Sequence, residues 1–239
     1  MAVSTNAKHN QLLAALPQDQ WQRWLPHLEH VEFRLGHVLY EAGDTLSHVY
    51  FPTTAIVSLL YVMHNGESAE IAVVGNEGVI GVSLFMGGES TSSRARVQSA
   101  GGAFRLAASL MKEEFDRGGP VLHLLLRYTQ ALMTQMVQTA ACNKHHSLDQ
   151  QLCRWLLLSV DRLQGTEMQM TQELIANMLG VSPARATEGA RTLQSAGLID
   201  YARGRILVLD RAGLEKRSCE CYGVVRKEYD RLLPDRLAA

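Results

Sequence analysis

The side chains most suited to chemistry lie in a short predicted helix that begins at Ser182. Its apolar positions, Ala186, Ala190 and Leu193, would form a buried side, and several polar side chains would lie outside it. These polar residues are Arg185, Thr187, Glu188 and Arg191. A guanidinium group can hydrogen-bond to guanine or phosphate, and a carboxylate can accept from the amino group of cytosine. The spacing therefore fits recognition of a DNA duplex, with a solvated Glu–Arg pair as the alternative.

A second predicted helix, just before the first, would hold this one in place. Thr171 is a suitable N-cap, and the apolar residues Leu174, Ile175, Met178 and Leu179 would be buried. Gly180 stands where a helix must end with positive φ, and Ser182-Pro183 restarts the chain with an N-cap and a first-turn proline. Two helices joined in this way form a helix-turn-helix, although any helical hairpin could show part of the pattern.

The residues that follow favour the DNA-binding interpretation. The segment AGLIDYARGRILVLDRAGL predicts a helix end, a strand, a tight turn at residues 203–205 and a second strand. Arg203 and Arg205 would lie at the tip of this β-wing, where an adjacent phosphate backbone would pass. The combined pattern predicts a winged helix that binds DNA.

A long helix is predicted to start near Val121, after the break at Gly118-Gly119-Pro120. Its side chains alternate by four and three residues, as in a coiled-coil seam. The predicted seam consists of Leu125, Thr129, Leu132, Met136, Thr139 and Asn143. We expect it to form the interface of a symmetric dimer; the alternative is a helix packed on its own domain. Ser147 is a plausible N-cap for the next helix.

The N-terminal half has a different pattern. Residues 10–28 carry apolar side chains at helical spacing. From about 30 to 108, short β-branched or aromatic runs are separated by the turn signals EAGD, HNGE, GNEG and MGGES. This predicts an antiparallel sandwich or barrel, with Asn65-Gly66 as the strongest hairpin signal.

The composition is that of an ordinary globular protein: 46% of the 239 residues are hydrophobic, 20% are charged and the net charge is −1. DNA contacts must therefore depend on the placement of individual arginines rather than on the net charge of the whole protein.

No apolar run is long enough to span a membrane, and the first residues lack a basic stretch followed by an apolar one. We expect a cytoplasmic protein without membrane contacts.

The cysteines and histidines predict neither a metal site nor an enzyme. Cys142, Cys153, Cys219 and Cys221 lack metal-finger spacing and fit reduced thiols. His145-His146 is expected to be solvated, and Cys219-x-Cys221 is a weak signal for a thiol sensor. The predicted β region offers only His37, His48 and His64, which are too widely spaced for a metal-dependent catalytic site.

The order of these parts resembles the Crp/Fnr family of bacterial transcription regulators. The helix-turn-helix and wing segments are similar to its DNA-binding signature, and FRLGHVLYEAGDTLSHVYF is similar to the first strands of its cyclic-nucleotide-binding-type β-roll. The resemblance covers roughly residues 28–210. It implies an α+β chain with a helix and antiparallel β-roll effector domain at 1–118, a dimerisation helix at 119–146 and a winged helix-turn-helix domain with a C-terminal helix at 147–239.

The resemblance also implies how such a protein acts: a homodimer binds a two-fold symmetric operator, and RNA polymerase is a partner. Residues 182–195 would enter the major groove. Thr171, Ser182, Arg203 and Arg205 match positions that grip phosphate, and Ala184, Thr187, Glu188 and Arg191 match the groove-facing side. The best-known members place an Arg-Glu pair and a later Arg on this face. Here the matching residues are Pro183, Ala184 and Glu188, so we expect a different operator.

The expected effector site departs from the family's cAMP pocket. Val82 occupies the position of the ribose-binding glutamate, and Ser93-Arg94 replaces Arg-Ser in reversed order. Loss of the charge-assisted ribose bond would cost about 1.5–3 kcal/mol, so we expect an effector other than cAMP. The residues that could hold a nucleotide-like effector are Val82, Ser92, Ser93, Arg94 and Arg96; the two arginines could equally be solvated.

Two further expectations follow from the resemblance. The family's iron–sulfur sensors use N-terminal cysteines, and none precedes Cys142, so no such cluster is expected. The alternative to an effector-controlled regulator is an effector-independent protein, or a β-roll ligand-binding module that acts through protein contacts.

Overall fold

The N-terminal segment forms short helices rather than one continuous helix. The computed structural model describes residues 7–163 and 165–233. Its first elements are α2 (Gln11–Ala14), α3 (Gln18–Trp24) and the 3₁₀ helix η1 (Leu25–His27). The prediction of a single helix over 10–28 is wrong in continuity, because Pro17 stands between α2 and α3 in an extended conformation. Most apolar residues of this segment are still buried, including both Trp21 and Trp24.

An antiparallel β-roll follows, as predicted. One sheet has the order β1-β7-β3 and the other β2-β6-β4-β5. The strands are β1 (Glu29–Phe33), β2 (Val38–Tyr40), β3 (His48–Pro52), β4 (Ile56–Val62), β5 (Ser68–Val74), β6 (Ser93–Ser99) and β7 (Gly101–Ala107), with the 3₁₀ helix η2 (Val82–Leu84) after β5. Asn65-Gly66 does connect β4 to β5. Only Gly66 adopts positive φ there, and the Asn65 side chain accepts from the Glu67 amide.

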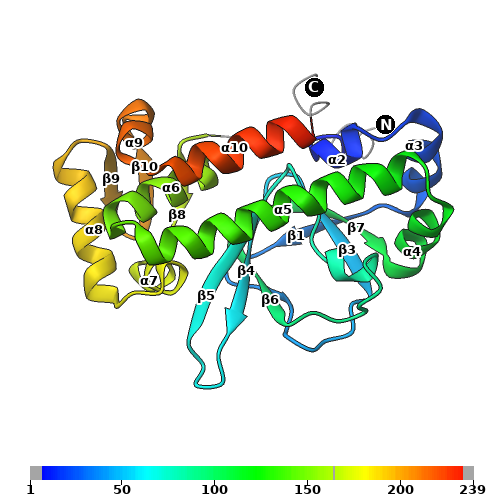
Figure 1. Cartoon of the computed structure of the whole chain (residues 1–239), viewed down its shortest axis with the longest axis horizontal. Coiled ribbons are helices and arrows are strands. Elements are labelled where there is room, and N and C mark those ends of the chain that lie inside the picture. The colour runs from blue at the N-terminus through cyan, green and yellow to red at the C-terminus, as the bar shows by residue number, and fades with distance from the viewer. Residues whose placement is uncertain (1–6, 164, 234–239) are drawn as a thin grey trace.

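Two helices lead from the roll to the second half of the chain. α4 (Ala108–Arg117) ends at Gly118, and α5 (Pro120–His145) begins after Gly118 and Gly119, both of which have positive φ. The predicted long helix is thus confirmed, and Figure 1 shows it running across the top of the β-roll. Ser147 caps α6 (Leu148–Val160) in a capping box with Gln150.

The C-terminal part contains the expected winged helix-turn-helix. Its elements are β8 (Glu167–Gln169), α7 (Gln172–Leu179), α8 (Pro183–Ser195), β9 (Ile199–Ala202) and β10 (Arg205–Val208), and the wing sheet has the order β8-β10-β9. Sequence reasoning missed β8, which is only three residues long. The tail forms two helices, α9 (Arg211–Arg217) and α10 (Glu220–Leu232), separated at Ser218-Cys219. In Figure 1, α10 lies along α5.

Buried polar contacts tie the β-roll to the helices. Trp155 on α6 donates its indole N–H to Glu70 on β5 at 3.1 Å, and Gln98 on β6 donates to the Ser159 hydroxyl at 3.0 Å. Buried polar groups need such partners, and their geometry fixes how two elements pack. Contacts between the β-roll and α6 are therefore specific. Among the described residues, no helix combines the length and apolarity needed to cross a lipid bilayer.

Candidate nucleic-acid interface

Side-chain caps and one glycine define the helix-turn-helix. The Thr171 hydroxyl accepts from the Leu174 amide, and the Ser182 hydroxyl accepts from the Arg185 amide. Gly180 adopts φ 62° and ψ 36°, the left-handed conformation that ends α7 and turns the chain toward α8. All three local predictions are confirmed.

One side of α8 is anchored and the other is open. Ala186, Ala190 and Leu193 are fully buried, and a Cβ added to Gly189 would be in van der Waals contact with Leu152 of α6. The open side forms a hollow lined by Ala184, Thr187, Glu188, Arg191, Thr192 and Ser195. The structure thus brings together the four residues predicted to face the groove and adds two more. Thr192 and Ser195 follow Glu188 by four and seven residues, so helical spacing could have identified them.

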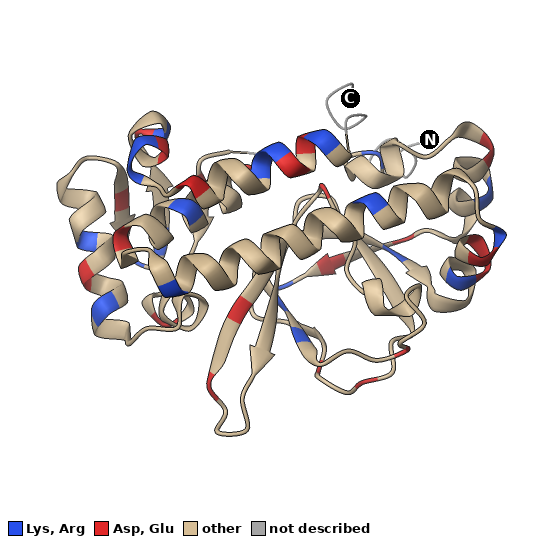
Figure 2. Ribbon diagram, viewed as in Figure 1, with Lys and Arg blue, Asp and Glu red and all other residues tan. Residues whose placement is uncertain are grey.

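Several basic side chains of this region have no carboxylate partner within the part of the chain that the structure describes. Among the described residues, no ion pair involves Arg185, Arg191 or Arg203. The Glu188–Arg pair considered as an alternative is therefore not formed at salt-bridge distance. Figure 2 shows basic and acidic positions alternating along α8. Such a face can offer both donors and an acceptor to base edges.

The wing carries its arginines at a tight turn. Arg203 and Gly204 have φ values of 52° and 75°, as a two-residue hairpin turn of the primed type requires. Arg203 is exposed, whereas Arg205 forms an ion pair with Glu167 at 3.1 Å. Both ends of that pair are more than 45% exposed, so it is weak in water and can be exchanged for a phosphate.

Thr171 is exposed but, unlike the open face of α8, it borders the β-roll. It lies in a groove of about 230 Å³ that α7 forms with the β-roll, together with Glu173, Asn177 and the roll residues Gly36 and Arg96. The predicted phosphate contact at Thr171 is thus adjacent to the effector half of the chain.

Two protein-family models match the two halves of the chain. The family model described as a cyclic nucleotide-binding domain matches residues 30–117, and the one described as a Crp-like helix-turn-helix domain matches residues 150–217. The chain belongs to the Crp/Fnr family of transcriptional regulators. No protein with a curated function matches its sequence.

Solved structures of Crp/Fnr proteins share the fold at low identity. A putative Crp/Fnr regulator from Eubacterium rectale has 18% identity and a TM-score of 0.68, covering 87% of this chain and 98% of that one. FixK2 from Bradyrhizobium japonicum has 16% identity and a TM-score of 0.67, covering 80% and 98%. The c-di-GMP-responsive regulator CLP from Xanthomonas campestris has 14% identity and a TM-score of 0.62, covering 81% and 100%.

The seam predicted on α5 requires a correction. In this Crp/Fnr chain Leu125, Thr129, Leu132 and Thr139 are at most 7% exposed, packed within the chain itself. Met136 is half-buried, and only Asn143 is exposed. The same four-and-three spacing recurs one residue later, where Leu126, Met133 and Val137 are 47%, 57% and 64% exposed. The β-roll and neighbouring helices thus cover most of the predicted seam, and the neighbouring stripe is the apolar face left open.

The proposed effector residues do not form one site. Ser93 is buried with Ala95 and Val97 on one face of β6, whereas Arg94 and Arg96 lie on the opposite face. Arg94 donates to Glu41 at 2.6 Å, and Arg96 lines the groove beside α7. Val82 is half-buried on η2, and Ser92 is exposed before β6. The two arginines therefore do not point toward the buried side of β6, where Ser93 lies.

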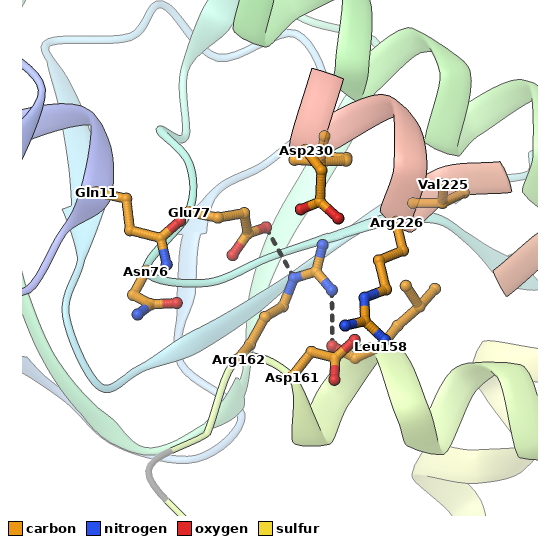
Figure 3. Close-up of a pocket in the computed structure, with 10 residues that line it drawn as sticks. Gln11, Asn76, Glu77, Leu158, Asp161, Arg162, Val225, Arg226 and Asp230 are labelled. Atoms are coloured by element: carbon orange, nitrogen blue, oxygen red, sulfur yellow. Dashed lines mark hydrogen bonds and ion pairs between the residues drawn. The ribbon is translucent and has the colours of Figure 1, made fainter. Parts of the chain in front are cut away.

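A polar pocket lies where the two halves of the Crp/Fnr chain meet. It measures about 240 Å³ and lies between α2, the turn after β5, α6 and α10. In Figure 3, the Arg162 side chain extends through this pocket. Its guanidinium donates hydrogen bonds to the Glu77 carboxylate and to the Leu158 carbonyl. The Arg162–Glu77 pair is about 95% buried. Sequence reasoning missed both residues, because single charges carry no signal of where they will be buried.

The prediction of a solvated His146 requires correction, because three cysteines surround it in the fold. Cys142, Cys219 and Cys221 are buried together, and His146 lies among them with its side chain only 18% exposed. His146 is therefore not a solvated residue. Burial raises the pKa of the Cys221 thiol, whereas a thiol sensor would need a lowered pKa. The cluster could not be predicted from residue spacing, because its members come from two segments more than seventy residues apart.

Proposed function

We propose that this Crp/Fnr regulator acts as a homodimer that binds a two-fold symmetric operator. The proposal rests on the open face of α8 and on the exposed Arg203. Among the described residues, Arg185, Arg191 and Arg203 have no ion-pair partner. Arg185 and Arg191 would read guanine, Glu188 would accept from cytosine, and Ala184 and Thr187 would contact the groove. Ser182, Arg203 and Arg205 would hold phosphates.

The dimer would form through the apolar stripe Leu126, Met133 and Val137 of α5. These residues follow the heptad spacing of a coiled-coil seam and leave large apolar side chains exposed. We assign effector reception to 1–118, dimerisation to 119–146 and DNA binding to 147–239. Contact with RNA polymerase would follow operator binding.

The β-roll would control the winged helix through the groove that contains Thr171. A phosphate at Thr171 would lie at the groove between α7 and the roll residues Gly36 and Arg96. An effector that changes the roll would thus change access to this position. The effector would not be cAMP, because Val82 offers no carboxylate for the ribose and Ser93-Arg94 stands in reversed order.

Operator binding is tested by selecting bound fragments from random DNA and measuring affinity by fluorescence anisotropy at several salt concentrations. Arg203→Ala should reduce the slope of log affinity against log salt by about 2, one phosphate for each protomer. Arg191→Ala should cost about 1–3 kcal/mol per half-site and relax the preference for one base. The matched control is Arg34→Ala, which removes an exposed arginine of the β-roll.

The alternative, a module that acts only through protein contacts, predicts a different result. Replacing Arg185, Arg203 and Arg205 together by Ala would then leave DNA affinity unchanged. That outcome would refute the DNA-binding roles assigned to α8 and the wing.

The dimer interface has its own test. Met133→Glu combined with Val137→Glu should give a monomer in analytical ultracentrifugation and abolish binding to the full operator. Met63→Glu, at a side chain that is 54% exposed beyond β4, should leave the dimer intact. A dimer that survives the α5 substitutions would contradict the assignment of the stripe.

A further inference from the structure

Three cysteines and one histidine converge at the end of α5. Cys142 and His146 come from the last turn of α5 and its C-cap, four residues apart and hence on one side of the helix. Cys219 and Cys221 come from the N-cap and first turn of α10. One ligand atom of each residue lies within 4.8 Å of the others.

Two of the six distances between the ligand atoms are close to the edges of a tetrahedron around one metal ion. The Cys142 and Cys219 sulfurs are 3.5 Å apart, and the Cys221 sulfur is 3.6 Å from Nδ1 of His146. A tetrahedral zinc site with ordinary bond lengths has S···S edges of about 3.8 Å and S···N edges of about 3.6 Å. Three thiolates and one imidazole form one of the usual ligand sets of structural zinc.

The surrounding groups complete the site. Nε2 of His146 lies 3.2 Å from a Glu220 carboxylate oxygen, which leaves Nδ1 directed at the sulfurs. Metal-binding histidines commonly hold a carboxylate through the second ring nitrogen in this way. The Gln151 side chain donates to the His146 carbonyl at 2.8 Å and holds the loop that carries the imidazole.

The N-terminus of α10 stabilises negative charge at this site. A zinc ion with three thiolates carries one net negative charge. Cys219 and Cys221 stand at the N-terminus of α10, a 13-residue helix whose dipole stabilises negative charge there.

We propose that Cys142, His146, Cys219 and Cys221 bind one zinc ion that fastens α10 to the end of α5. Binding replaces three S–H bonds by three Zn–S bonds and releases three protons, while the neutral imidazole donates its lone pair. The metal would fix the turn between α5 and α6, through which the DNA-binding part is attached. The site is independent of the operator and of any effector, and it carries no catalytic water position.

The test begins with the full-length protein purified without chelator. Elemental analysis should find a single zinc ion per chain, and reaction of the thiols with a mercurial should release it to a chromogenic chelator. After acid removal of the metal and refolding, titration with Co²⁺ alone should give the intense ligand-field bands of a tetrahedral site and thiolate-to-cobalt charge-transfer bands.

Variants locate the site. Cys221→Ser and His146→Ala should each lose the zinc and weaken the cobalt spectrum, with far-UV circular dichroism used to confirm folding. Cys153→Ala is the matched control, because Cys153 is equally buried but lies outside the cluster. It should retain a full equivalent of zinc.

Three results would overturn the proposal. One is a wild-type chain without zinc that gives no tetrahedral cobalt spectrum. Another is a disulfide between cluster cysteines, detected as a loss of two mass units in the native protein. The third is iron with acid-labile sulfide in place of zinc, which would assign the same ligands to an iron–sulfur cluster. Each result is separate from DNA binding, so failure here would leave the proposed function intact.

Discussion

Glu70 should make the stability of the protein depend on pH near neutrality. Its side chain lies between the β-roll and α6, where Oε1 accepts from Trp155 and Oε2 has no hydrogen-bond partner among the described residues. Burial raises the pKa of Glu70 from about 4.5 to about 7. The charges of Arg154 and Arg162 lower the pKa and offset only part of this effect.

The direction of this pH dependence follows from proton binding to Glu70. Between pH 4.5 and pH 7 the folded chain keeps a proton on Glu70 that the unfolded chain has lost, so the free energy of unfolding falls as pH rises. The stability contribution is fully present below the unfolded pKa and is lost as pH rises through the folded pKa. The full loss is roughly 3 kcal/mol, of which about 2.5 kcal/mol falls between pH 5 and pH 8.

Glu70→Gln isolates this contribution, because the amide oxygen can still accept from Trp155 but cannot ionise. Urea unfolding followed by tryptophan fluorescence, at pH 5 and at pH 8, gives the free energy of unfolding for each variant. Relative to the wild type, Glu70→Gln should gain about 2.5 kcal/mol on going from pH 5 to pH 8. Glu113→Gln, at an exposed carboxyl, should show no such gain. Parallel pH profiles for Glu70→Gln and the wild type would refute the reasoning.

Two other substitutions test the junction between the halves, both by urea unfolding. Arg162→Met should cost about 3–5 kcal/mol because it leaves the Glu77 carboxylate buried without its cation, and adding Glu77→Leu should recover much of the loss; a double variant as unstable as the single one would contradict this. Gly78→Ala should cost about 1–3 kcal/mol, since the new methyl group would overlap the buried Tyr128 ring. Gly223→Ala, with open space in α10, should not destabilise the chain; equal effects at the two glycines would exclude the clash.

The helix-turn-helix could be predicted from sequence because its determinants are local. Thr171 and Ser182 cap helices through amides only three residues away, and Gly180 permits a backbone conformation that other residues resist. The face of α8 follows from helical spacing once its buried residues are known. These rules act within a single turn, so they hold before any tertiary contact forms.

Which face of α5 is buried could not be predicted in the same way. Two adjacent stripes have the same heptad spacing, one through Leu125 and Leu132 and the other through Met133 and Val137. The positions of the β-roll and the neighbouring helices decided which stripe became core, because burial depends on what packs against the helix and not on its own pattern.

The sequence by itself determined the order of the parts and the local signals that start and stop α5, α6, α7 and α8. The tertiary structure alone decided which residues distant in the chain meet. It buried Glu70 against Trp155 and Arg162 against Glu77, and it directed Arg94 and Arg96 away from the buried side of β6. It also brought Cys142 and His146 to Cys219 and Cys221. The physical reason is that capping and periodicity act over three or four residues, whereas burial and ligand geometry depend on contacts that the sequence separates by dozens of positions.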